Sequence, residues 1–68
     1  MKQEFCGKWE NKGVVFEMFR RWGNDIKDHL EMETYPAGKE NERVIFAKTT
    51  HYIEPMDFLL YCEYNYNY

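Results

Sequence analysis

The chain has 68 residues, of which 44% are hydrophobic and 19% aromatic, and its net charge is −3. This composition excludes a disordered polymer, which would contain few apolar residues and many charges. The length predicts a single domain over residues 1–68 with one thin core, since a domain of this size buries only about 60% of the surface of its unfolded chain. A deep catalytic cleft is not expected in so small a domain.

A membrane span needs about 18 consecutive apolar residues, and no apolar run in the chain approaches that length. The first ten residues, MKQEFCGKWE, lack the apolar segment of a secretory signal. We therefore expect a cytoplasmic protein with no membrane partner. In that compartment Cys6 and Cys62 are expected to be reduced thiols.

The charges are unevenly distributed along the chain. Residues 1–21 carry five bases and three acids, whereas residues 22–42 carry two bases and six acids. An acidic middle segment argues against duplex DNA as a ligand, because affinity for DNA comes mostly from neutralised phosphates. It favours a partner protein with a basic surface.

The N-terminal third predicts a β-hairpin. Apolar and polar residues alternate over residues 4–10 and again over residues 14–22, which is the period of a strand. Asn11, Lys12 and Gly13 separate the two runs and supply the residues typical of a tight hairpin loop.

Residues 22–35 allow two interpretations. As a strand, a turn at residues 23–25 is followed by the alternating positions Leu30, Met32 and Thr34. As a helix, Asn24 would cap a segment over residues 24–34 with acids in its first turn. Residues 36–42 (PAGKENE) are typical of a loop.

Two further strands are expected in the C-terminal third. Residues 43–53 are rich in β-branched and aromatic side chains, and residues 58–68 alternate from Phe58 to the tyrosines at the end. A short connection containing Pro55 should join them as a hairpin. The predicted fold class is mainly β: a single small antiparallel sheet or meander of four to five strands, with a short helix near residues 24–34 as the α+β alternative.

The residue inventory argues against catalysis. The chain has no serine, and Cys62 lies among apolar positions, where a small buried hydrophobe is expected. Its two cysteines and two histidines form no C-x-x-C or H-x-x-x-H pair, the usual spacing of a zinc site. We therefore expect a protein that is not an enzyme and that has no metal and no cofactor.

The aromatic residues exceed what a thin core requires, and they suggest a binding surface. Tyrosine, tryptophan and arginine are the residues most enriched at binding hot spots. The expected partner-binding residues are Arg20, Arg21, Trp22, Tyr61, Tyr64, Tyr66 and Tyr68. The expected steering charges are Asp25, Asp28, Glu31 and Glu33.

These features predict a small, acidic, aromatic-rich protein that acts by occupying the surface of a partner protein, as an inhibitor or adaptor. The chain resembles small phage-encoded inhibitors of host or defence proteins in size and composition, which implies a viral protein. The acidic steering charges favour a basic target, such as a surface that normally holds nucleic acid. One alternative is a structural homodimer that pairs through the C-terminal strand.

A second alternative is a module for single-stranded nucleic acid, in which bases stack on rings beside cations. The residues for that role are Lys8, Lys12, Arg20 and Arg21, with Trp9, Phe19 and Trp22.

Overall fold

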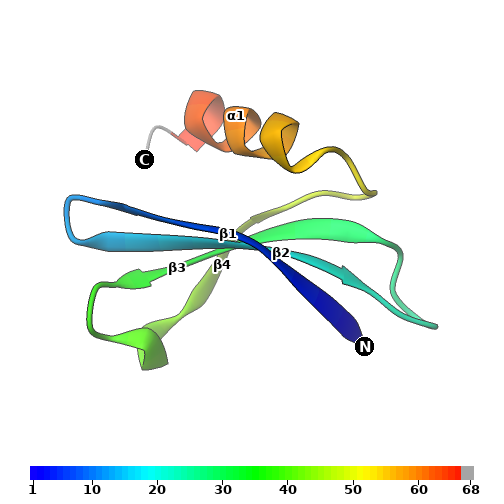
Figure 1. Cartoon of the computed structure of the whole chain (residues 1–68), viewed down its shortest axis with the longest axis horizontal. Coiled ribbons are helices and arrows are strands. Elements are labelled where there is room, and N and C mark those ends of the chain that lie inside the picture. Colours follow the sequence, from blue (N-terminus) through cyan, green and yellow to red (C-terminus); the bar gives the residue numbers. More distant parts are fainter. Residues whose placement is uncertain (67–68) are drawn as a thin grey trace.

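Four strands form one antiparallel sheet in chain order, and a single helix lies across one of its faces (Figure 1). The computed structural model describes residues 1–66, with side chains described as far as Asn65. The strands are β1 (Lys2–Asn11), β2 (Val14–Trp22), β3 (His29–Pro36) and β4 (Val44–Lys48), and the helix is α1 (Pro55–Tyr66). A short 3-10 turn spans Glu40–Glu42. The predicted single antiparallel sheet of four to five strands is confirmed, with four strands.

The predicted N-terminal hairpin is confirmed, down to its loop. Asn11 pairs with Val14, which leaves Lys12 and Gly13 as a two-residue connection. Both have positive φ, 53° and 79° respectively. Two successive residues with positive φ define the turn whose twist matches that of the flanking strands.

The strand interpretation of residues 24–34 is correct, and the helix alternative is wrong. β3 pairs with β2 from His29 opposite Arg21 to Pro36 opposite Val14. Leu30 and Met32 are fully buried on the face that α1 covers. In a helix, residues two apart point to nearly opposite sides, whereas in a strand they point to the same face of the sheet.

The predicted C-terminal strand is wrong, because residues 55–66 form a helix. Pro55 occupies the first helical position, where a missing N–H costs nothing, and Asp57 lies in the first turn, where the helix dipole favours an acid. Phe58 and Cys62, four residues apart, are both fully buried against the sheet. The predicted hairpin with residues 43–53 is therefore also wrong, and residues 55–66 do not form the strand through which the homodimer alternative would pair.

The core lies between the sheet and α1. It consists of Phe16, Met18, Leu30, Met32 and Ala47 from the sheet with Phe58 and Cys62 from the helix. Burial raises the pKa of Cys62 to about 11, so this thiol is neutral at pH 7 and acts as the small hydrophobe that was expected.

Trp9 closes one side of this core because β1 carries a glycine beside it. A Cβ atom at Gly7 would lie 2.6 Å from the Trp9 ring, so only glycine lets the indole lie against the strand. Each edge strand also contains a β-bulge: Cys6 is the extra residue in β1, and Phe46 is the extra residue in β4.

Candidate protein-binding surface

Arg20 and Arg21 are neighbours in β2, so their side chains point to opposite faces of the sheet. Arg20 donates two hydrogen bonds to the carboxylate of Asp28, at 2.9 and 2.6 Å. Its guanidinium carbon lies 5.0 Å from the centroid of the Trp22 ring and 4.6 Å from that of Tyr52. The hydrogen bonds from Arg20 hold the pKa of Asp28 below its usual value. Arg20 thus contacts both Trp22 and Asp28.

Arg21 lies on the face of the sheet that no helix or strand of the described residues covers. Its Nη1 atom donates to Glu31 and, at 2.6 Å, to Glu33. The Arg21 side chain is only 13% exposed. Arg21, an expected partner-binding residue, is therefore paired with Glu31 and Glu33, which were expected to be steering charges.

A second arginine separates two acids that face one another. Glu17 in β2 lies directly opposite Glu33 in β3, an arrangement that is destabilising between like charges. Nη1 of Arg43 donates to both carboxylates, at 2.9 and 3.0 Å, and the Tyr35 hydroxyl donates to Glu17 at 2.5 Å. Burial alone would raise the pKa of Glu17, but the hydrogen bonds from Arg43 and Tyr35 hold it below its usual value.

His29 completes this group at the other end. Its Nδ1 lies 2.6 Å from the carbonyl oxygen of Lys27, and its Nε2 lies 2.6 Å from the Glu31 carboxylate. Both partners are acceptors, so both contacts are hydrogen bonds only when the ring is the doubly protonated imidazolium. The pKa of His29 is raised, first by the bond to the Lys27 carbonyl and then by Glu31, while burial opposes the shift.

We call this group the ion-pair network; it consists of Glu17, Arg21, His29, Glu31, Glu33, Tyr35 and Arg43. Sequence reasoning missed Glu17, His29, Tyr35 and Arg43 as its members. The sequence signal for the network is the alternation of side chains in β2 and β3, which places their acids and Arg21 on the same face of the sheet. Of the expected steering acids, Asp25 is exposed in the bend between these strands.

Tyr61, Tyr64 and Tyr66 lie on α1 rather than on an edge strand. Tyr61 and Tyr64 are 49% and 89% exposed. Tyr66 is the last residue of α1, and Tyr68 lies outside the described residues.

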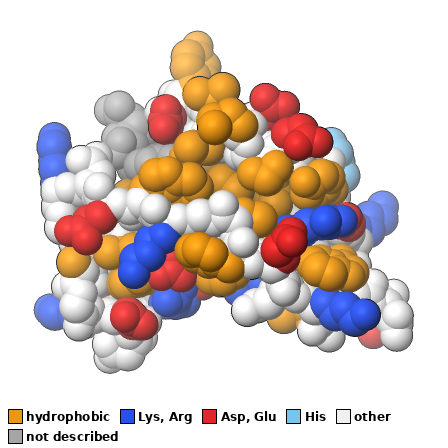
Figure 2. All heavy atoms as spheres, viewed as in Figure 1, with side chains coloured by type: hydrophobic (Ala, Val, Ile, Leu, Met, Phe, Trp, Pro, Cys, Tyr) orange, Lys and Arg blue, Asp and Glu red, His pale blue; other side chains and the backbone are white. Residues whose placement is uncertain are grey.

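The outward side of α1 is apolar. Met56, Leu60 and Tyr64 follow one another at intervals of four residues, and they are 63%, 54% and 89% exposed. This spacing aligns them along one side of the helix, opposite the buried Phe58 and Cys62. We call these three residues the outer stripe. Figure 2 shows hydrophobic side chains projecting from the helix at the top of the molecule.

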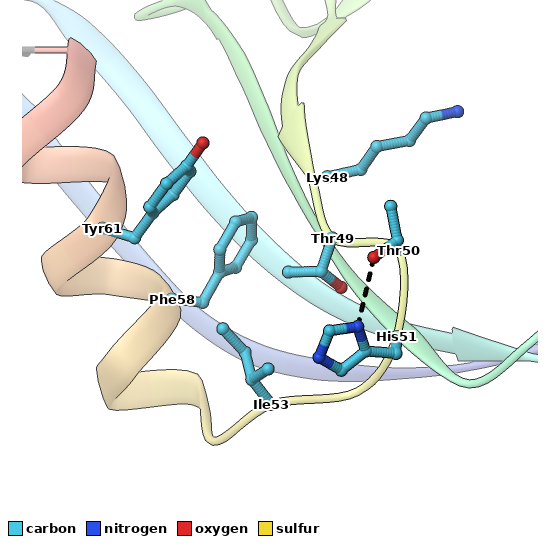
Figure 3. Close-up of a pocket in the computed structure, with 7 residues that line it drawn as sticks. All are labelled: Lys48, Thr49, Thr50, His51, Ile53, Phe58 and Tyr61. Atoms are coloured by element: carbon cyan, nitrogen blue, oxygen red, sulfur yellow. Dashed lines mark hydrogen bonds between the residues drawn. The ribbon is translucent and has the colours of Figure 1, made fainter.

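A small pocket of about 270 Å³ lies beside α1, between the helix and the segment that follows β4 (Figure 3). Phe58 and Tyr61 line it from the helix, and Thr49, His51 and Ile53 line it from the opposite side. Lys48 and Thr50 complete the lining, and the Lys48 ammonium points away from the other side chains. The volume suits one side chain better than a substrate, since ligand sites usually exceed about 300 Å³.

His51 is one of the titratable residues that line this pocket. Its Nδ1 atom contacts the Thr50 hydroxyl at 3.1 Å. A catalytic hydroxyl–histidine pair also needs a third group that orients the ring. Hydrogen bonds from the ring to such a group are not found among residues 1–66, and the same residues hold no cluster of three His, Cys, Asp or Glu that could bind a metal ion.

Comparison with known proteins gives no further assignment. No protein-family model, curated protein or solved structure matches the chain. Within residues 1–66, the structure contains no helix with the length and apolarity needed to span a membrane.

Proposed function

We propose that this chain is a binding protein that acts by occupying the surface of a partner protein, as an inhibitor or adaptor, and that the outer stripe of α1 is its contact surface. The observation that carries the proposal is the exposure of Met56, Leu60 and Tyr64 along one side of a helix whose opposite side is already buried. Anchors at such intervals are typical of a helix that binds in an apolar groove.

The free energy gained by burying the outer stripe is large enough to contribute to binding. Full burial of one large apolar side chain stabilises a complex by about 1.5–3 kcal/mol. Three such side chains reach several kcal/mol before the entropy cost of association. Tyr64 adds a ring with a hydroxyl, which suits the partly hydrated centre or rim of an interface.

The remaining features are consistent with this role. The pocket that Phe58 and Tyr61 line from the same helix has room for one side chain of a partner. Cys6 and Cys62 are both free thiols, which fits a protein of the cytoplasm. Arg20 and Arg21 already bind carboxylates within the chain, so a nucleic acid would have to compete with Asp28, Glu31 and Glu33 for them.

The test compares how well two surface variants capture a partner protein. Leu60→Asp places a charge in the outer stripe, and Val44→Asp places one on an apolar side chain of nearly equal exposure in β4, 54% against 58%. Tagged chains are incubated with nuclease-treated lysate of the source cells, and bound proteins are quantified by mass spectrometry. We expect Leu60→Asp to lose at least about 90% of a stoichiometric partner, the tenfold effect of one interface residue, and Val44→Asp to retain it.

Thermal melting of each variant must first show a cooperative transition like that of the unmodified chain. Equal recovery of the partner by both folded variants would contradict the assignment of the contact surface to α1.

A further inference from the structure

Acidic residues border the outer stripe on both sides. At about 100° of rotation per residue, Glu63 falls on one side of the stripe and Asp57 on the other. Both are exposed. Figure 2 shows acidic side chains to either side of the hydrophobic crest over the helix. The sequence of α1, PMDFLLYCEYNY, contains no lysine or arginine.

Unlike the acids of the sheet, Asp57 and Glu63 form no ion pair among residues 1–66. The ion pairs of residues 1–66 all lie within the sheet and the loops before β3 and β4, and their acids are Asp28, Glu17, Glu31 and Glu33. The helix dipole accounts for Asp57, which lies in the first turn. It does not account for Glu63, because an acid near the C-terminal end of a helix is unfavourable and no base there balances it.

We propose that the outer stripe binds an apolar strip on a partner protein that is bordered by lysine or arginine side chains. This inference rests on the proposed function and specifies the chemistry of the partner. The apolar strip would contact Met56, Leu60 and Tyr64, while the flanking bases would pair with Asp57 and Glu63. Opposite charges at the rim of an interface speed association and select the partner.

A second copy of the chain does not fit this surface. Two α1 helices related by a two-fold axis through Leu60 would place Asp57 of one copy beside Glu63 of the other. With no base in the helix, such a pair would bring like charges together at both ends of the contact. The charge pattern therefore favours a different protein.

The test uses three synthetic helical peptides as probes. One has a leucine stripe flanked by lysines, the second has the same stripe flanked by glutamates, and the third has the lysines with serine in place of leucine. Binding to the full chain is measured by fluorescence anisotropy at low and at physiological salt. We expect the lysine-flanked leucine peptide to bind about tenfold more tightly than either of the others, with the advantage decreasing as salt rises.

Two charge variants then test the acids directly. Asp57→Lys with Glu63→Lys should reverse the preference between the two leucine peptides. Asp57→Asn with Glu63→Gln should abolish it, and this variant avoids placing a base at the N-terminal end of the helix. Sedimentation equilibrium of the unmodified chain should show a monomer.

An unchanged preference in both charge variants would overturn the inference, as would a dimer that Leu60→Asp dissociates. These failures differ from failure of the proposed function. If Leu60→Asp abolishes capture of the cellular partner while the charge variants retain it, the contact surface stands and the basic border is wrong. If Leu60→Asp captures the partner normally, the surface itself is wrong.

Discussion

The two faces of the sheet are closed in different ways, although the same strands build both. One face carries Met18, Leu30 and Met32 and is covered by α1. The other face has no covering element among residues 1–66 and carries acids that arginine side chains enclose. Glu31 and Glu33 are only 9% and 7% exposed there. A thin domain can thus bury one face under a helix and the other under its own long side chains.

The two kinds of closure differ in what they contribute to stability. Apolar burial against α1 favours folding roughly in proportion to the area removed from water. Enclosed ion pairs contribute little net stability, because the cost of desolvating the charges offsets their attraction. Removing one partner of such a pair is nevertheless costly, since it leaves a buried charge unpaired. Substitutions on the two faces should therefore differ in kind and in size.

The largest effect is expected on the covered face. Phe58→Ala removes a fully buried ring that joins α1 to the sheet, and we expect a loss of about 3–5 kcal/mol in the free energy of unfolding. In a domain this small that loss approaches the whole stability. Urea denaturation followed by circular dichroism measures it. Leu60→Ala, on the exposed side of the same helix, is the control and should change stability by less than about 0.5 kcal/mol. Equal losses in the two variants would mean that α1 does not cover the sheet as described.

A smaller effect is expected on the uncovered face. Arg21→Met keeps most of the side-chain length but leaves Glu31 and Glu33 without their shared cation, and we expect a loss of about 1–3 kcal/mol. The matched control is Arg20→Met, in the next residue of β2, because its ion pair with Asp28 is much more exposed. The control should lose less stability in the same denaturation experiment. A larger loss for Arg20→Met would contradict the assignment of the buried charges to the uncovered face.

The smallest effect is a dependence of stability on pH. The pKa of His29 is higher in the folded chain than its unfolded value of about 6.5. Its contribution is therefore complete below about pH 6.5 and is lost as the pH rises through the folded pKa. The pKa values of Glu17 and Glu31 are lowered, so their contributions are complete above about pH 4.3 and are lost as the pH falls through the folded values. Stability should be greatest between these limits.

Denaturation from pH 4 to pH 9 measures this profile. His29→Gln should remove the decline on the alkaline side, whereas His51→Gln, on the exposed loop after β4, should keep it. An unmodified chain that is as stable at pH 8.5 as at pH 6 would show that the two contacts of His29 do not stabilise the fold.

Most of the sheet could be predicted from the sequence, because its signals are local. Asn11, Lys12 and Gly13 fix the first loop, and alternation fixes the strands on either side of it. The C-terminal segment could not be predicted from alternation. Phe58 and Cys62 satisfy the period of two and equally the four-residue spacing of a helix, and both are buried. Pro55 at the start suits a turn between two strands and equally the first position of a helix.

The proposed contact surface could be predicted only in part from the sequence. Tyr61 and Tyr64 are exposed as the surplus of aromatic residues suggested, but Met56 and Leu60 were not recognised with them. Their common side exists only if the segment is helical. The ion-pair network was missed for another reason: alternation shows which residues share a face of a sheet, but it does not show which face remains uncovered or how long side chains fold over it.

The bulges at Cys6 and Phe46 have a consequence for the behaviour of the chain at high concentration. Fibre growth requires a regular edge on which strands from other molecules stack in register. Each free edge of this sheet is interrupted by one extra residue, which leaves the spacing of its N–H and C=O groups irregular. Within residues 1–66, the two edge strands β1 and β4 are therefore irregular templates, which disfavours amyloid-like stacking of further chains on them.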